Sequence, residues 1–371
     1  MKLQEQINEV IDHIVYLQIM GSFVPNSNFN KIKEIVNSTN QFIRNSPERE
    51  IREKLPEIKV VLGKMITVFM NKFPLKRQLN LITKEFNSFF KKGEEVYTYG
   101  LEHGWLDQQM DLKELGYYDD TPYHFRIGLG THRGKGSIEE DFLIKDAFNI
   151  RVKAERYHNL LMVYGEQLKK TQEEGKNEFT NELYSQIREL KFEVCAFSRL
   201  TIVSFYSFIE GFVNSVGHSY HLKNEQKLSN QEIELLKGFK KRNYISLKSK
   251  IEKFQKLIRD DKQAIIVVSD DNQIPEDFKL FFDYYEQLRN SAMYYSPLKE
   301  TIWMKPKEWL DRAIEFSELS TKIALQFWKA CYPNSEGPKY IGKLDYTVHL
   351  ENAKKRNFRV EKILNEERNW L

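Results

Sequence analysis

Apolar residues recur at intervals of three and four along most of the chain, which is the spacing of one face of an α-helix. The first such run comprises Leu3, Ile7, Val10, Ile14 and Leu17. Similar runs predict helices over residues 30–43, 47–72 and 74–90, and the second of these is expected to restart near Pro56, since proline interrupts helical hydrogen bonding. Strand-like alternation is scarce, so the pattern predicts an all-α fold.

The helical spacing stops between Tyr97 and Ser137, where seven glycines and several aromatic residues gather. We expect an irregular connector over residues 97–136, with a short helix at 111–115. Residues 128–137 resemble a phosphate-binding loop only in composition. A P-loop has four residues between its glycines and then Lys directly before Ser or Thr. Here three residues separate the glycines and a further glycine precedes the serine, which favours a plain loop.

Helical spacing returns after Ser137, a plausible N-cap that three acidic residues follow. Glycines and prolines then punctuate the chain, and they predict helices over residues 137–170, 179–216, 231–239, 275–295 and 306–331, with a loop at 218–228. Three regions result: a helical N-terminal region over residues 1–135, a helical domain over 136–345, and a charged C-terminal arm over 346–371 with a helical pattern.

The predicted helix 179–216 is apolar on most faces, and Arg199 and Glu210 are its only charges between Val194 and Val216. Such a helix is usually central and buried. Its polar residues fall on one narrow stripe that comprises Ser204, Ser207, Glu210, Asn214 and His218. Two interpretations stay open. The small serines allow close helix packing while Glu210 pairs with an arginine, or the stripe lines a groove that holds Arg289.

Residues 237–259 hold nine lysines and arginines against Glu252 alone, a local excess of eight positive charges. An apolar stripe in the same stretch allows it to pack while it presents its lysines to solvent. The run is either a solvated face or a surface for a phosphate-bearing partner such as RNA. The candidate RNA-binding residues are Lys240, Lys241, Arg242, Lys248 and Lys253.

Composition narrows the classes of protein to consider. The chain has 371 residues, 41% of them hydrophobic, with a formal net charge of +4 and two cysteines. Neither cysteine has the spacing of a disulfide framework or a thiolate metal site, so we expect no cofactor and no metal. We also expect a cytoplasmic protein without a membrane segment, because no stretch approaches the roughly 18 apolar residues that span a bilayer.

One arginine stands at the end of the helix predicted over 275–295. The sequence from Leu288 to Pro297 reads Leu-Arg-Asn-Ser-Ala-Met-Tyr-Tyr-Ser-Pro, with Arg289 and Asn290 before the proline stop. Together with the apolar helix, the basic stretch and the tryptophan-containing closing helix, this resembles the HEPN superfamily of bacterial helical domains. The resemblance covers residues 179–340.

The resemblance implies a metal-independent ribonuclease, often a toxin or an anti-phage defence effector, that works as a homodimer. Its motif is an arginine, a polar residue and a histidine four to six positions after the arginine. The histidine moves the proton for attack by the RNA 2′-hydroxyl, which requires a pKa near neutrality. Here Tyr294, Tyr295 and Ser296 stand where the histidine is expected. A tyrosine, whose unperturbed pKa is about 10, is a poor base at neutral pH.

The sequence therefore predicts a HEPN-like protein with a degenerate motif that binds RNA or a protein partner. An active ribonuclease that uses Tyr294, Tyr295 or a borrowed His218 or His221 is one alternative. A purely structural interaction protein is the other. The candidate catalytic residues are Arg289, Asn290, Tyr294 and Tyr295, with Glu210 and Asn214 in support.

Overall fold

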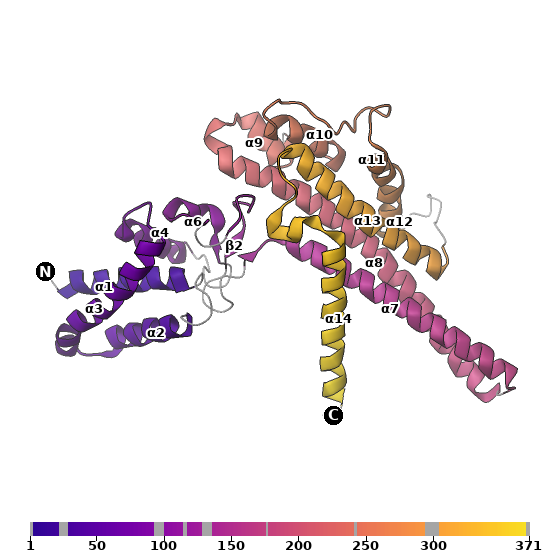
Figure 1. The fold of residues 1–371 in the computed structure, drawn as a ribbon, viewed down its shortest axis with the longest axis horizontal. Helices are drawn as coiled ribbons and strands as arrows, with labels where there is room; N and C mark the ends of the chain where they lie inside the picture. The colour runs from indigo at the N-terminus through magenta and orange to yellow at the C-terminus, as the bar shows by residue number, and fades with distance from the viewer. Residues whose placement is uncertain are drawn as a thin grey trace. The chain divides into compact units, whose positions relative to one another are not determined.

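The chain forms two compact units, Met1–Ile138 and Glu139–Leu371, and each is described by itself (Figure 1). The computed structural model describes residues 3–21, 29–92, 100–113, 117–127, 136–175, 177–240, 243–293 and 304–368. Helices dominate both units, and the described strands are two residues long. The all-α fold class is thus confirmed.

The first unit packs four helices around a core to which α1 contributes Val10, Ile14 and Leu17. These helices are α1 (Leu3–Gly21), α2 (Phe29–Asn45), α3 (Glu48–Lys72) and α4 (Leu79–Lys91). A short helix follows, α6 (His103–Gln109), beside an antiparallel sheet in the order β1-β2-β3. The strands of that sheet are β1 (Leu101–Glu102), β2 (Arg126–Ile127) and β3 (Gly136–Ser137).

Two predictions for this unit differ from the structure. Helix α3 does not restart at Pro56 but continues through it. Pro56 is exposed, so water can satisfy the carbonyl group that loses its helical partner. Residues 111–113 of the short helix predicted at 111–115 are not helical, and residues 114–115 lie outside the described residues. A short helix is found instead at α6, where Gly104 lets the backbone approach the Tyr123 ring. The loop at 128–135 lies outside the described residues.

The second unit is built on three long helices (Figure 1). They are α7 (Glu139–Glu173), α8 (Asn177–Asn224) and α13 (Pro306–Cys331). Helices α7 and α8 join through the Phe148–Phe205 rings, whose centroids lie 5.0 Å apart, and α8 meets α13 at Phe212 and Trp328. The predicted bounds of α13 are confirmed at both ends, because a proline starts it and its apolar series faces the core.

Smaller elements surround these helices. A 3₁₀ turn, η1 (Glu225–Lys227), leads to α9 (Asn230–Leu236), the hairpin β4 (Phe239–Lys240) and β5 (Asn243–Tyr244), and α10 (Leu247–Ile258). After a loop come α11 (Glu276–Leu280), the π-helical turn η2 (Phe281–Tyr285) and α12 (Glu286–Met293). A 3₁₀ segment, η3 (Lys339–Leu344), precedes α14 (Tyr346–Arg368), which confirms the helical pattern of the C-terminal arm.

The predicted end of the central helix is wrong. Helix α8 does not stop at Val216 but continues through Gly217 to Asn224, where a loop was expected. Gly217 is not a helix breaker here. A Cβ atom at this position would lie 2.4 Å from Cε2 of Phe254 on α10, so the glycine lets the two helices approach closely.

Helix α14 packs on α7, beginning with its first turns. Tyr346 and His349 both contact the ring of Phe148 on α7, at centroid distances of 5.5 and 5.6 Å. Further along α14, Glu361 forms an ion pair with Arg156 of α7. Val360, Ile363 and Leu364 are each about half exposed there.

Among the described helices, α8 alone is long and apolar enough to cross a bilayer, judged by length and composition. The expectation that no stretch approaches this length is therefore wrong for α8. Of its most apolar window, 44% is buried inside the unit, where Ile202, Phe205 and Phe208 belong to the core. A core helix passes the same test, so composition alone does not assign α8 to a membrane.

The contact at Gly217 predicts a loss of stability on substitution. Gly217→Ala forces a methyl group against Phe254, and overpacking of this kind costs about 1–3 kcal/mol. Thermal unfolding followed by circular dichroism should show a Tm about 2–10 °C lower. Gly165 on α7 is the matched control, because no atom lies within 4 Å of its Cβ position. Gly165→Ala should leave the Tm unchanged or raise it; an equal fall for both variants would contradict the packing argument.

Candidate functional site

Arg289 lies on α12 against the side of α8. Its guanidinium carbon is 4.4 Å from the ring centroid of Tyr206 on α8, and Nη1 donates a hydrogen bond to Oδ1 of Asn290 at 2.8 Å. Its Nε is buried and has no acceptor among the described residues. Within the same part of the chain, no carboxylate forms an ion pair with this arginine. Arg289 thus retains unused hydrogen-bond donors beside an aromatic ring.

Tyr206 is the support of this arginine. Its hydroxyl donates to Oε1 of Glu286 at 2.6 Å, and its ring stacks on Phe281 with an interplanar angle of 8°. Burial, aided by the bond to Glu286, raises the pKa of Tyr206, so the hydroxyl stays protonated and acts as a donor. We call Arg289, Asn290, Tyr206 and Glu286 the Arg289 group.

A π-helical turn stands directly before the Arg289 group. The turn η2 interrupts an otherwise α-helical segment, and it closes with a hydrogen bond from the N–H of Glu286 to the carbonyl of Phe281. Such turns are rare and often occur at functional sites. The turn buries Phe281, Phe282 and Tyr285 and ends at the carboxylate that holds Tyr206. No spacing in the sequence predicts it.

A second group forms one turn further along α8. The Tyr244 hydroxyl donates to Oε1 of Glu210, and the Lys250 Nζ lies 3.8 Å from the Tyr244 ring centroid. The same Nζ donates to Oδ1 of Asn214 at 2.9 Å. Gly238, at a φ of 81°, leaves the space that Lys250 fills. We call Glu210, Tyr244, Lys250 and Asn214 the Lys250 group.

Both groups repeat one arrangement: a tyrosine donates to a glutamate while a cation lies over its ring. The two predicted supporting residues, Glu210 and Asn214, belong to the Lys250 group. Glu210 takes its bond from Tyr244, and no arginine pairs with it among the described residues. The neighbouring Ser207 bonds back to the carbonyl of Val203 on its own helix. Residue spacing alone therefore found the stripe but not its partners.

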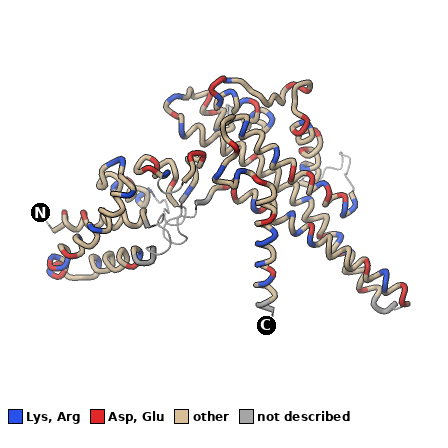
Figure 2. The backbone as a smooth tube through the Cα atoms, viewed as in Figure 1, with Lys and Arg blue, Asp and Glu red and all other residues tan. Residues whose placement is uncertain are grey.

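The basic run on α10 and its hairpin is less uniform than its sequence suggests. Lys250 is 1% exposed, so the expectation that this lysine faces solvent is wrong. Lys256 pairs with Glu252 at 3.0 Å. Lys253 is exposed, and Nζ of Lys248 lies 5.9 Å from the Phe282 ring centroid. Lysines and arginines alternate with acidic residues over this unit (Figure 2).

The structure does not describe several of the predicted site residues. Tyr294, Tyr295, Lys241 and Arg242 lie outside the described residues, as does the side chain of Lys240.

The histidines proposed as borrowed bases are too far from Arg289. His218 and His221 follow Tyr206 on α8 by 12 and 15 residues, which is about 18–23 Å along the helix axis. His221 is buried and lies 3.5 Å from Glu225. The expectation that either histidine stands near Arg289 in the same chain is therefore wrong.

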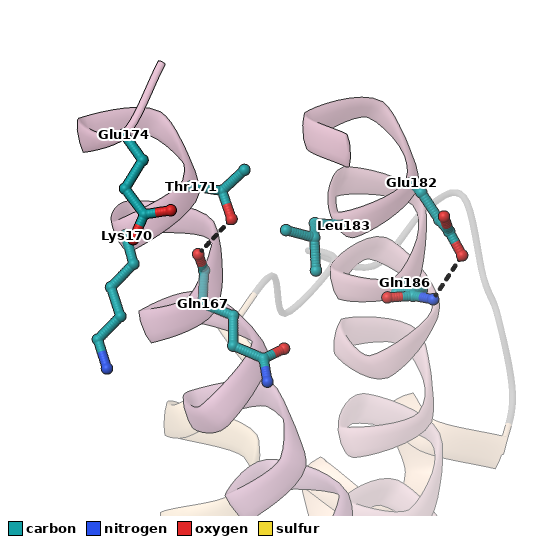
Figure 3. Close-up of a pocket in the computed structure, with 7 residues that line it drawn as sticks. All are labelled: Gln167, Lys170, Thr171, Glu174, Glu182, Leu183 and Gln186. Atoms are coloured by element: carbon teal, nitrogen blue, oxygen red, sulfur yellow. Dashed lines mark hydrogen bonds between the residues drawn. The ribbon is translucent and has the colours of Figure 1, made fainter. Parts of the chain in front are cut away.

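One open hollow lies elsewhere in the unit, between α7 and α8 near their shared turn (Figure 3). It has a volume of about 400 Å³, and Leu183 points into the space between the helices. Gln186 donates to Glu182 at 3.3 Å on its rim. Among the described residues, no three histidine, cysteine or acidic side chains gather as they would around a metal ion.

Comparisons with known proteins add no family. No protein-family model matches the chain, and searches of the curated proteins and of the solved structures find no match to it. The chemistry of the Arg289 and Lys250 groups is therefore the basis on which a function can be inferred.

The buried amine predicts a dependence of stability on pH. Burial lowers the pKa of Lys250, while nearby Glu210 opposes the shift. Below the pKa of an unfolded lysine, about 10.4, the unfolded chain then binds more protons than the folded chain. Protonation of buried Lys250 therefore costs stability, and the free energy of unfolding should rise as the pH increases toward about 10.4.

Urea unfolding between pH 8 and 10 measures this effect. The free energy of unfolding of the wild type should rise relative to that of Lys250→Met as the pH increases. Lys253→Met is the matched control, because it removes the same charge from the exposed face of α10. A constant difference between wild type and Lys250→Met over this range would contradict a depressed pKa.

Proposed function

We propose that the second unit binds RNA and holds one phosphate at Arg289 and Asn290, as a HEPN-like protein that no longer cleaves it. The observation that carries this proposal is the state of Arg289. Its guanidinium lies on a tyrosine ring, and it has donors without acceptors and no carboxylate partner among the described residues. A planar guanidinium with free donors suits the oxygen atoms of a phosphate.

The neighbours of Arg289 support a binding site. Asn290 fixes one edge of the guanidinium through Nη1, and the Tyr206 ring lies against its face. Both contacts order the long arginine side chain before a ligand binds. Binding therefore costs less conformational entropy. The negative charge of Glu286 lies close by, where it accepts the Tyr206 hydroxyl.

A purely structural role for Arg289 is less well supported. Structural arginines in half-buried positions normally have their donors satisfied, because an unmade hydrogen bond is costly. The buried Nε of Arg289 lacks an acceptor among the described residues. A ligand that supplies oxygen atoms would remove this cost.

Binding is favoured over cleavage because no histidine among the described residues lies beside Arg289. Attack by a 2′-hydroxyl requires a group that accepts its proton. Tyr206 stays protonated beside Arg289, and the described histidines of α8 are more than three helical turns away. An active ribonuclease would have to rely on Tyr294 or Tyr295 and is the alternative. A role in anti-phage defence or in a toxin-like system remains a prediction of the resemblance.

The proposal includes a homodimer. Its support is the distal half of α14, where Val360, Ile363 and Leu364 share one helical face and are each about half exposed. A second copy of the chain could cover this face.

RNA binding can be measured by fluorescence anisotropy with a labelled single-stranded RNA. Arg289→Ala should weaken binding about 10- to 100-fold, which corresponds to loss of a hydrogen-bonded charge. The slope of log K against log salt should fall in magnitude by about 0.7, the value for one phosphate contact on a single strand. Arg289→Lys keeps the charge but not the planar fork, so its affinity should be intermediate.

Arg188→Ala is the matched control. Arg188 is an exposed arginine of α8, 18 residues before Tyr206, and its side chain is 79% exposed. If wild type and Arg289→Ala bind RNA equally, the proposal fails. If the wild type shortens the RNA without metal and Arg289→Ala does not, the ribonuclease alternative replaces it.

Light scattering tests the dimer. The molar mass measured for the wild type should be twice the chain mass of 44.3 kDa. Ile363→Glu should shift it toward the monomer, because a charge would enter an apolar contact. Lys362→Glu also changes the charge of the arm, at the adjacent position, and should leave the mass unchanged. A wild-type monomer at tens of micromolar would overturn this part of the proposal.

A further inference from the structure

The distal half of α14 concentrates positive charge, as the blue segments of that helix show (Figure 2). Residues 354–362 hold five cations against Glu361 alone, and five minus one leaves an excess of four positive charges. The cations are Lys354, Lys355, Arg356, Arg359 and Lys362. The excess within this short stretch equals the formal net charge of the whole chain. A charge this dense on one helix marks a surface for an anionic partner.

Two of these cations stand on the side of α14 that faces away from α7. The side that meets the bundle comprises Ala353, Asn357 and Glu361, which follow one another at intervals of four residues. Ala353 belongs to the core, and the other two bond to residues of α7. At 100° per residue, Lys355 and Arg359 lie within about 20° of the opposite direction. Both are exposed, so a ligand can reach them without displacing α7.

An aromatic ring stands beside these two cations. Phe358 is 71% exposed, more than any other large apolar side chain that the structure describes. Around the helix it lies about 60° from Lys355 and about 100° from Arg359, so the three residues share one side of α14. Arg359 Nε donates to the carbonyl of Lys355 at 3.3 Å, which orients the guanidinium along the helix. We call Lys355, Phe358 and Arg359 the Phe358 face.

The position of the ring among the cations favours a nucleic acid over a membrane. A helix that lies in a membrane interface gathers its apolar residues on one side and its cations on the other. Here Phe358 shares the cationic side, whereas the apolar residues 360, 363 and 364 lie about 120–160° away from it around the helix. Proteins that bind single-stranded nucleic acid combine cations along the phosphates with aromatic rings on which bases stack. The Phe358 face has both kinds of group.

We infer that the Phe358 face binds single-stranded RNA, with Lys355 and Arg359 on phosphate groups and Phe358 stacked on a base. The inference rests on the proposed function for its ligand, but it requires no contact with Arg289. Stacking needs a base that is free of its duplex partner, whereas phosphates are present in both forms, so a single strand is preferred. Because every base has a π face, the surface accepts different sequences.

The test uses the full chain and three probes: oligouridine of about 12 nucleotides, an RNA duplex of equal length, and vesicles of phosphatidylcholine with phosphatidylserine. Phe358→Leu keeps an apolar side chain but loses the ring, so it should weaken oligouridine binding about 5- to 100-fold. Phe358→Trp keeps a ring and should bind at least as tightly as the wild type. The double variant Lys355→Gln/Arg359→Gln should lower the magnitude of the salt slope by about 1.4, which is about 0.7 for each phosphate contact.

Two matched controls should bind oligouridine like the wild type. Arg188→Gln/Lys191→Gln removes two cations from exposed positions of α8, and Val348→Ala shortens an apolar side chain of α14 that is 48% exposed. Equal binding of oligouridine by Phe358→Leu and the wild type would overturn stacking, as would duplex RNA that binds as tightly as oligouridine. If Phe358→Leu loses affinity for vesicles alone, a membrane partner replaces RNA.

The outcomes separate this inference from the proposed function. If Arg289→Ala loses affinity while the variants of the Phe358 face bind oligouridine like the wild type, the phosphate site at Arg289 stands and this inference fails. If the variants of the Phe358 face lose affinity and Arg289→Ala does not, the inference stands and the Arg289 site fails. If the wild type binds neither RNA probe, both fail. Unchanged far-ultraviolet circular dichroism for each variant shows that the fold is retained.

Discussion

The burial of α8 is the constraint on which the second unit depends. Its apolar side chains form one core with α7 and α13, so the few polar residues in its middle must find partners at the edge of that core. Glu210 and Asn214 find them on the hairpin and α10. The Tyr206 hydroxyl finds Glu286 on α12. The hairpin, α10 and α12 therefore supply the partners that the polar residues of α8 need.

Local sequence signals predicted the bounds of a helix correctly where no tertiary contact opposed them. Proline at Pro306 and an apolar face account for α13, and both of its ends were predicted correctly. They failed at Gly217 because the meaning of that glycine comes from Phe254, which lies 37 residues further along the chain. They failed at Pro56 because its exposure on a helix surface removes the usual penalty. In each failure a tertiary contact or solvent exposure outweighed local propensity.

The candidate site was predicted in part for a similar reason. Arg289 and Asn290 stand out because they are polar residues at a helix end. Tyr206 and Tyr244 do not, since tyrosines are common in this chain and only the cations above their rings distinguish them. Lys250 was counted with solvent-exposed lysines because charge runs carry no information on burial. The sequence holds no signal for η2, whose effect depends on the packing of three aromatic rings.

The mixed charge of the two groups bears on the kind of ligand they suit. A surface that recognises RNA by charge alone gathers lysines and arginines, and its affinity falls steeply with salt. Here Glu286 and Glu210 stand beside Arg289 and Lys250, so the local field is close to balanced. Attraction at long range is then small, and affinity must come from short-range geometry. The guanidinium of Arg289 has such a geometry, because it lies on the Tyr206 ring and Glu286 holds the hydroxyl of that tyrosine.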